Sequence, residues 1–98
     1  MKKYKDFLSL NEHQAFDFLK IISDEERFKI IYLLHQKTYC VCELSELLNL
    51  PQNLISYHLK ILKDFGLLIL NPKGRKNFYE LNQKQLNKNL KLINKIFN

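Results

Sequence analysis

Glycine and proline are scarce in this chain, with two of each among its 98 residues, so few breaks interrupt its helical patterns. No apolar run approaches the roughly 18 residues that a membrane helix needs, and no basic-then-apolar signal segment opens the chain. The length is that of one domain and excludes a multidomain enzyme. We expect a single domain over residues 1–98, in the cytoplasm, with no membrane partner.

Acidic residues are few in the second part of the chain. Residues 1–57 carry seven basic and eight acidic residues, whereas residues 58–98 carry nine basic residues and only Asp64 and Glu80. The whole net charge of +6 therefore arises after residue 57. Such an imbalance favours an anionic partner, with nucleic acid first and a membrane surface second.

Two helices are predicted near the start of the chain, because apolar residues recur there at helical spacing. Asn11 and Ser23 each open a sequence with the form of a capping box, which predicts a helix start at each of them. The first helix is expected to end near Ile22 and the second near His35. The buried stripe of the second helix is expected to contain Phe28, Ile31 and either Leu34 or Leu33.

The rest of the chain predicts a helix-turn-helix, a hairpin and a last helix. The expected elements are helices over about 42–48 and 51–65, strands over 67–70 and 77–81 that flank a basic turn at 71–75, and a helix from about Gln83. Pro51 separates the two central helices, and Gly66 suits the left-handed stop of the second. The predicted fold is mainly α with a small β-hairpin (α+β): a winged helix-turn-helix with about five helices.

This order of elements favours binding to double-stranded DNA. In a winged helix-turn-helix, the second central helix lies in the major groove, where amides and hydroxyls reach base edges and lysines reach phosphates. The residues predicted to contact DNA are Gln52, Asn53, Ser56, Tyr57, Lys60, Lys63, Lys73, Arg75 and Lys76. The alternative is that these polar residues only face solvent. The basic hairpin and the charge imbalance together favour DNA binding over this alternative.

Several motifs in order resemble the ArsR/SmtB-type bacterial metal-responsive repressors. They are ISDEERFKII at residues 22–31, CVCEL at 40–44, LISYHLKILKDFGLL at 54–68, and GR followed by FYEL at 74–81. The resemblance implies a homodimer, built from the first and last helices, that binds a palindromic operator and releases it when an inducer binds. Apolar stripes on both terminal helices favour the same dimer. His58 matches the family's histidine in the recognition helix, where packing or phosphate contact is expected, and the resemblance adds it to the predicted DNA-binding residues.

Cys40 and Cys42 are the only cysteines. They match the box of the arsenic-responsive members, which implies that As(III), Sb(III) or another soft metal ion acts as inducer, since thiolates select soft ions. Ser45 stands where that box often has a third cysteine. Residues two apart on a regular helix point to nearly opposite sides, so both thiols can hold one ion only where the helix has not properly begun, or by distorting its first turn. The alternatives are small buried hydrophobes and redox thiols.

No catalytic pattern supports an enzyme, and no cofactor is required. The zinc-type site of the family's last helix is absent, because residues 83–98 contain no His, Asp or Glu. Three alternatives remain beside the metal-responsive repressor. They are a DNA-binding regulator that is redox-responsive or has no metal inducer, a winged-helix protein-interaction module, and a membrane-surface helix at the C-terminus.

Overall fold

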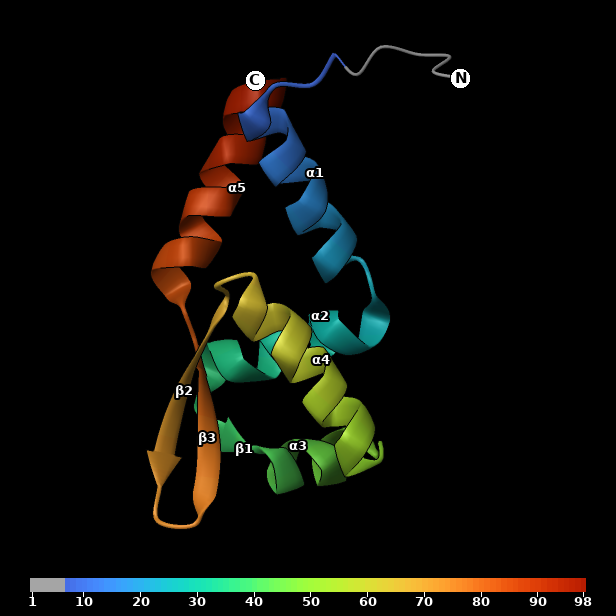
Figure 1. Ribbon diagram of the computed structural model, residues 1–98, viewed down its shortest axis with the longest axis vertical. Coiled ribbons are helices and arrows are strands. Elements are labelled where there is room, and N and C mark those ends of the chain that lie inside the picture. Colours follow the sequence, from blue (N-terminus) through green and yellow to red (C-terminus); the bar gives the residue numbers. More distant parts are fainter. Residues whose placement is uncertain (1–6) are drawn as a thin grey trace.

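The computed structural model describes residues 7–98, which form an elongated molecule of 49 × 31 × 20 Å (Figure 1). The helices are α1 (Leu10–Ile22), α2 (Glu25–Gln36), α3 (Val41–Leu48), α4 (Gln52–Asp64) and α5 (Gln83–Phe97). The strands are β1 (Tyr39–Cys40), β2 (Leu68–Lys73) and β3 (Lys76–Leu81). The terminal helices α1 and α5 lie side by side at one end, and the other elements form the opposite end (Figure 1). The winged helix-turn-helix fold with five helices is confirmed for the described residues.

The first two helices begin at residues other than those predicted. Ser9 caps α1: its hydroxyl accepts from the Glu12 backbone N–H at 3.2 Å, and the Glu12 carboxylate accepts from the Ser9 N–H at 3.0 Å. Asp24 caps α2 by accepting from the Arg27 N–H at 3.0 Å. The expected caps at Asn11 and Ser23 are therefore wrong. The Ser23 N–H is already bonded to the Leu19 carbonyl at 3.0 Å, so Ser23 closes α1 and cannot open α2.

The buried stripe of α2 also differs from the prediction. Ile30, Ile31 and Leu34 face the core, whereas the Phe28 side chain is 57% exposed. The inward face of α2 is decided by its contacts with α4 and β3, which lie far away in the sequence. A count of apolar spacings within α2 cannot include those contacts.

The sheet has three antiparallel strands in the order β1-β3-β2. The strand β1 was not predicted, because two residues are too short to show an alternating pattern. It pairs Tyr39 with Tyr79 and Cys40 with Phe78. The hairpin strands are longer than expected and meet at Gly74 and Arg75. β2 tolerates Pro72 because it is an edge strand.

The helix α4 crosses the core and carries the most regular apolar stripe of the central helices. Ile55, Leu59 and Leu62 are fully buried at i, i+4 and i+7, as predicted. Gly66 adopts φ +89° after the helix, and the Leu67 N–H returns to the Leu62 carbonyl at 3.0 Å, so the predicted left-handed stop is confirmed. Burial of this stripe fixes which face of α4 is left outside.

Candidate nucleic-acid interface and thiol pair

The outward face of α4 is polar and basic. Its exposed side chains are those of Gln52, Asn53, Ser56, Tyr57, Lys60 and Lys63. Pro51 precedes the helix and provides no side-chain cap, so the positive end of the helix dipole is left for another partner. Amides and hydroxyls on this face have the chemistry to bond base edges, and an uncapped helix start favours a phosphate.

One of the lysines on this face is held by an acidic neighbour. The Lys60 Nζ lies 2.9 Å from the Asp64 Oδ2, and both side chains are exposed. The hydrogen bond from Lys60 holds the pKa of Asp64 below its ordinary value. A phosphate that binds Lys60 must therefore compete with the Asp64 carboxylate.

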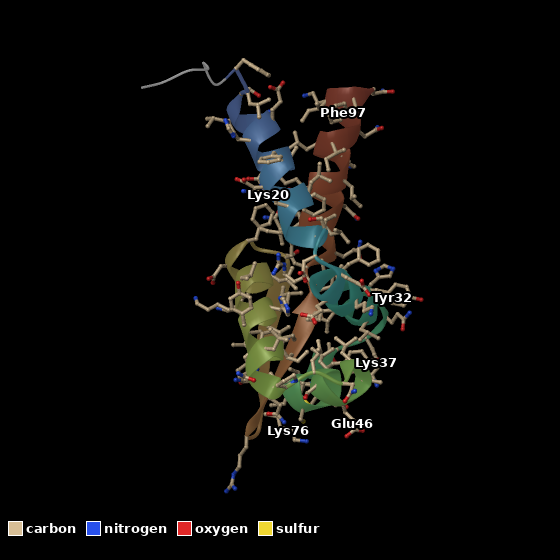
Figure 2. The ribbon with its side chains drawn as sticks, turned by 90° about the vertical axis from the view of Figure 1, so that its right-hand side faces the viewer. Lys20, Tyr32, Lys37, Glu46, Lys76 and Phe97 are labelled. Atoms are coloured by element: carbon tan, nitrogen blue, oxygen red, sulfur yellow. The ribbon has the colours of Figure 1, made fainter. Side chains whose placement is uncertain are left out.

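The hairpin tip adds a second group of exposed cations, Lys73, Arg75 and Lys76. Gly74 turns the chain at φ +63°, and the Lys73 Nζ lies 5.9 Å from the centre of the Phe78 ring. The tip and the N-terminal end of α4 lie at the same end of the molecule, opposite the free ends of α1 and α5 (Figure 1). In the side view, the labelled Lys76 lies at this same end, far from Phe97 of α5 (Figure 2).

His58 does not lie on the outward face of α4. Its side chain is buried against α2, with Nδ1 3.2 Å from the Arg27 Nη1 and Nε2 2.7 Å from the Glu26 Oε1. Because both ring nitrogens are occupied inside the protein, the expected DNA contact of His58 is corrected to a packing role, one of the two roles that the sequence left open.

The two thiols meet at the start of α3. Cys40 has extended backbone angles and lies just before the helix, whereas Cys42 is the second helical residue. Their sulfur atoms are 2.9 Å apart, Cys40 buried and Cys42 exposed. The helix begins between them, which is the first of the two arrangements in which residues two apart can face a common ligand.

Glu43 completes the surroundings of Cys40. Its carboxylate accepts from the Cys40 backbone N–H at 3.0 Å, which lowers the pKa of Glu43. Burial, and then the hydrogen bond with Cys42, raises the pKa of the Cys40 thiol, and the Glu43 backbone N–H offsets this only in part. Glu43 was not among the predicted site residues, although it follows Cys40 by three residues, the spacing of a capping box.

The thiol pair supplies two ligand atoms and opens toward a shallow hollow. This hollow of about 280 Å³ is lined by Tyr39, Cys42, Glu43, Glu46 and Leu47. Within residues 7–98, no third Cys, His, Asp or Glu completes a group with the two thiols; the one group of three lies elsewhere and consists of Asp24, Glu26 and His58. No helix in the described part of the chain is long and apolar enough to cross a membrane.

A helix-turn-helix with a polar outward face, followed by a basic hairpin, is the architecture of winged-helix DNA-binding proteins. Residues 24–69 match the sequence model of the family described as bacterial regulatory protein, arsR family. The chain is 41% identical over 69 residues to the arsenical resistance operon repressor of Bacillus subtilis strain 168, covering 69% of this chain and 66% of that protein. It is 38% identical over 79 residues to the repressor of the same name from Staphylococcus xylosus, covering 78% and 76%.

A cadmium resistance transcriptional regulatory protein, CadC, from Listeria innocua is 33% identical over 78 residues, covering 79% of this chain and 60% of that protein. Among solved structures, reduced HlyU from Vibrio cholerae N16961 superposes with a TM-score of 0.74 at 29% identity, covering 89% of this chain and 92% of that one. The chain belongs to the ArsR family of bacterial regulatory proteins.

Proposed function

We propose that this chain is a homodimeric repressor that leaves a palindromic operator when arsenite, antimonite or another soft metal ion binds Cys40 and Cys42. The observation that carries the proposal is the 2.9 Å separation of the two sulfur atoms at the junction of β1 and α3. Arsenical resistance repressors among the relatives support the metalloid, and the CadC relative keeps other soft ions open. As a regulator of bacterial DNA, the protein acts in the cytoplasm.

The proposed DNA contacts come from α4 and the wing. The outward residues of α4 enter the major groove, and the hairpin cations bind flanking phosphates. The proposed contact residues are Gln52, Asn53, Ser56, Tyr57, Lys60, Lys63, Lys73, Arg75 and Lys76. His58 is not among them, because it is buried.

The proposed dimer uses α1 and α5. Large apolar side chains on these helices are left uncovered by the single chain: Phe16 is 50% exposed, Leu90 49% and Phe97 79%. Exposed apolar area of this kind is removed from water when a second copy packs against it. A dimer also places two α4 helices on one duplex, as a palindrome requires.

The thiol pair contacts both parts of the DNA-binding unit. Cys40 pairs with Phe78 in the wing strand β3, and the helix α3 that begins beside Cys42 packs against α4. An ion that binds both sulfurs fixes the junction of β1 and α3 in the arrangement that the ion requires. Where DNA binding needs a different arrangement of this junction, the ion and the DNA weaken each other's binding by linkage.

The chemistry of arsenous acid suits a thiol with a raised pKa. When As(OH)₃ condenses with two thiols, two As–O bonds break, two As–S bonds form, and the thiol protons leave with the two hydroxides as water. A divalent cation such as Cd²⁺ must instead release two protons to solvent, which the raised pKa of Cys40 opposes. We expect arsenite binding to change little with pH between about 6 and 8, and cadmium binding to weaken as the pH falls.

Titration of a reduced protein–DNA complex tests the proposal. A duplex selected from a random library by the wild-type protein serves as the operator, and fluorescence anisotropy follows its release as arsenite is added. We expect release from the wild type and none from the variant with Cys40→Ser and Cys42→Ser. The single variant Thr38→Ala, at an exposed residue just before β1, keeps both thiols and is the matched control. Normal release from the double variant would show that metalloid sensing through this pair is wrong.

A second candidate function, sensing of oxidants, is favoured by the same sulfur–sulfur distance. Hydrogen peroxide accepts two electrons and two protons from the thiols, so that one disulfide and two waters form. Peroxide would then release DNA without any metalloid, and dithiothreitol would restore binding. Release by arsenite together with full DNA binding after peroxide treatment would favour the metalloid sensor.

A further inference from the structure

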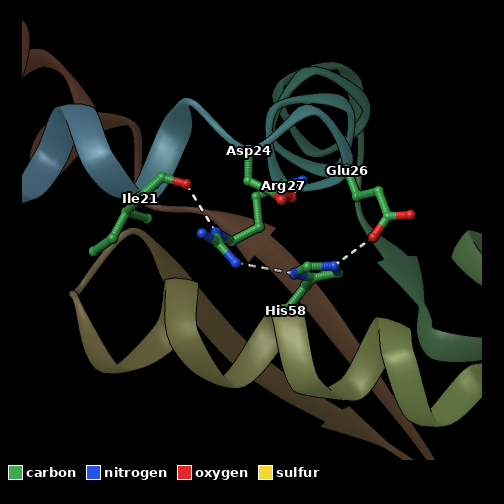
Figure 3. A network of polar contacts seen from close by, with 5 residues as sticks. All are labelled: Ile21, Asp24, Glu26, Arg27 and His58. Carbon is green, nitrogen blue, oxygen red and sulfur yellow. Dashed lines mark hydrogen bonds and ion pairs between the residues drawn. The ribbon is translucent and has the colours of Figure 1, made fainter.

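Arg27, in the first turn of α2, connects α1 with the recognition helix α4 (Figure 3). Its Nε donates to the Ile21 backbone carbonyl in the last turn of α1 at 2.8 Å. Its Nη1 lies 3.2 Å from the Nδ1 of His58 in α4. Through its own backbone N–H, Arg27 is also bonded to the Asp24 cap. One side chain thus joins the helix proposed for dimerisation to the helix proposed for DNA reading.

The guanidinium decides which tautomer His58 adopts. Arginine has only N–H donors, so the Nδ1 of His58 accepts the hydrogen bond. A neutral imidazole then carries its proton on Nε2, which lies 2.7 Å from the Glu26 Oε1 and donates to it. Both ring nitrogens of a side chain that is only 4% exposed are satisfied in this way.

The same argument opposes a cation site at this position. Ligand atoms of Asp24, Glu26 and His58 lie within 4.8 Å of one another. A cation would need the lone pair of Nε2, which moves the imidazole proton to Nδ1, where it would face the Arg27 donor. The arrangement is therefore a hydrogen-bond network between helices.

We propose that Arg27 and Glu26 are positioning residues that act through His58 to hold α4 at a fixed orientation to the α1–α5 pair. In a dimer built on α1 and α5, the distance between the two recognition helices depends on how each α4 is held relative to its own α1. The network is a polar connection across that boundary, beside the 2.9 Å contact of His35 in α2 with Gln83 in α5, and it contributes to the half-site spacing that the dimer accepts. This inference rests on the proposed dimeric operator binding, and it is independent of the inducer.

The test compares two duplexes: the palindrome selected by the wild type, and the same palindrome with its half-sites moved apart by one base pair. Arg27→Lys keeps the charge but loses the planar fork, and Glu26→Ala removes the acceptor of His58. Glu26→Gln keeps an acceptor oxygen for His58, so this conservative variant should restore the DNA binding that Glu26→Ala loses. Glu25→Ala, which removes an exposed neighbour paired with Lys29, is the matched control.

We expect Arg27→Lys and Glu26→Ala to bind the selected spacing about tenfold more weakly, the effect of losing one charge-assisted hydrogen bond, and to prefer it less over the altered spacing. Glu26→Gln and Glu25→Ala should bind as the wild type does. All affinities are compared at equal folded fraction, measured by circular dichroism. Variants that melt earlier but keep wild-type affinity and spacing preference would reduce the network to a stabilising role and overturn the proposal.

Nitrogen-15 chemical shifts of His58 provide a second test without DNA. In the neutral imidazole we expect the proton on Nε2 and a bare Nδ1, and the opposite tautomer would overturn the network. A wild-type chain that selects no palindrome would contradict the proposed function instead, and the nitrogen shifts would still decide the tautomer.

Discussion

Replacing Lys60 by alanine should reduce the salt dependence of DNA binding. Lys60 is exposed on the outward face of α4, where its ammonium group lies 2.9 Å from the Asp64 carboxylate. The substitution removes a cation from the proposed phosphate contacts and leaves Asp64 without its partner. Asp64→Asn should have the opposite effect, because it frees Lys60 and removes a negative charge that repels phosphates.

The magnitude follows from counterion release. Log affinity falls with log salt concentration, and each phosphate contact makes this slope steeper by about 0.9. A dimer of the variant lacks two such contacts, so its slope should be shallower than that of the wild type by about 1.8. When the salt concentration rises from about 50 to 200 mM, the DNA affinity of the wild type therefore falls about twelvefold more than that of the variant. The cost to folding is small, because the ion pair is exposed to solvent.

The assay is anisotropy on the selected duplex across a salt series, with melting curves to confirm equal folding. Lys29→Ala is the control, because Lys29 forms the same i, i+4 ion pair with Glu25 at 2.9 Å, but on α2. Equal slopes for Lys60→Ala, Lys29→Ala and wild type would refute the assignment of the α4 face to DNA.

Three further predictions concern folding. Leu59→Ala should lower the free energy of unfolding by about 2–5 kcal/mol, measured by urea denaturation, because Leu59 is fully buried. Gly66→Ala should cost about 1–2 kcal/mol at φ +89°, and a variant as stable as wild type would show that this backbone angle is not required. The lowered pKa of Glu43 stabilises the fold above its unfolded-state pKa of about 4.3, and this contribution is lost as the pH falls through the lower folded value. Glu43→Gln should therefore make the urea midpoint less dependent on pH below about 5, and an unchanged profile would contradict this role of the Cys40 N–H.

Local patterns in the sequence determined the helices of the DNA-binding unit. The apolar spacing of Ile55, Leu59 and Leu62, with Gly66 behind them, predicted both the extent of α4 and its buried face. The basic hairpin and the scarcity of acids after residue 57 predicted the polar, basic outward surface. These features could be predicted because periodicity and turn chemistry act between residues that are close in the chain.

Only the tertiary structure decided the contacts between distant segments. The pairing of Cys40 with Phe78 connects the thiols to the wing, and no local pattern marks a two-residue strand. His58 is polar and lies in a helix with an exposed polar face, yet Arg27 and Glu26, more than 30 residues earlier, hold it inside. The meeting of the two sulfurs depends on where α3 begins, which Glu43 and the β1 pairing fix together. Sequence spacing identified the candidate residues, but long-range packing determined which of them are exposed, which are buried and which contact one another.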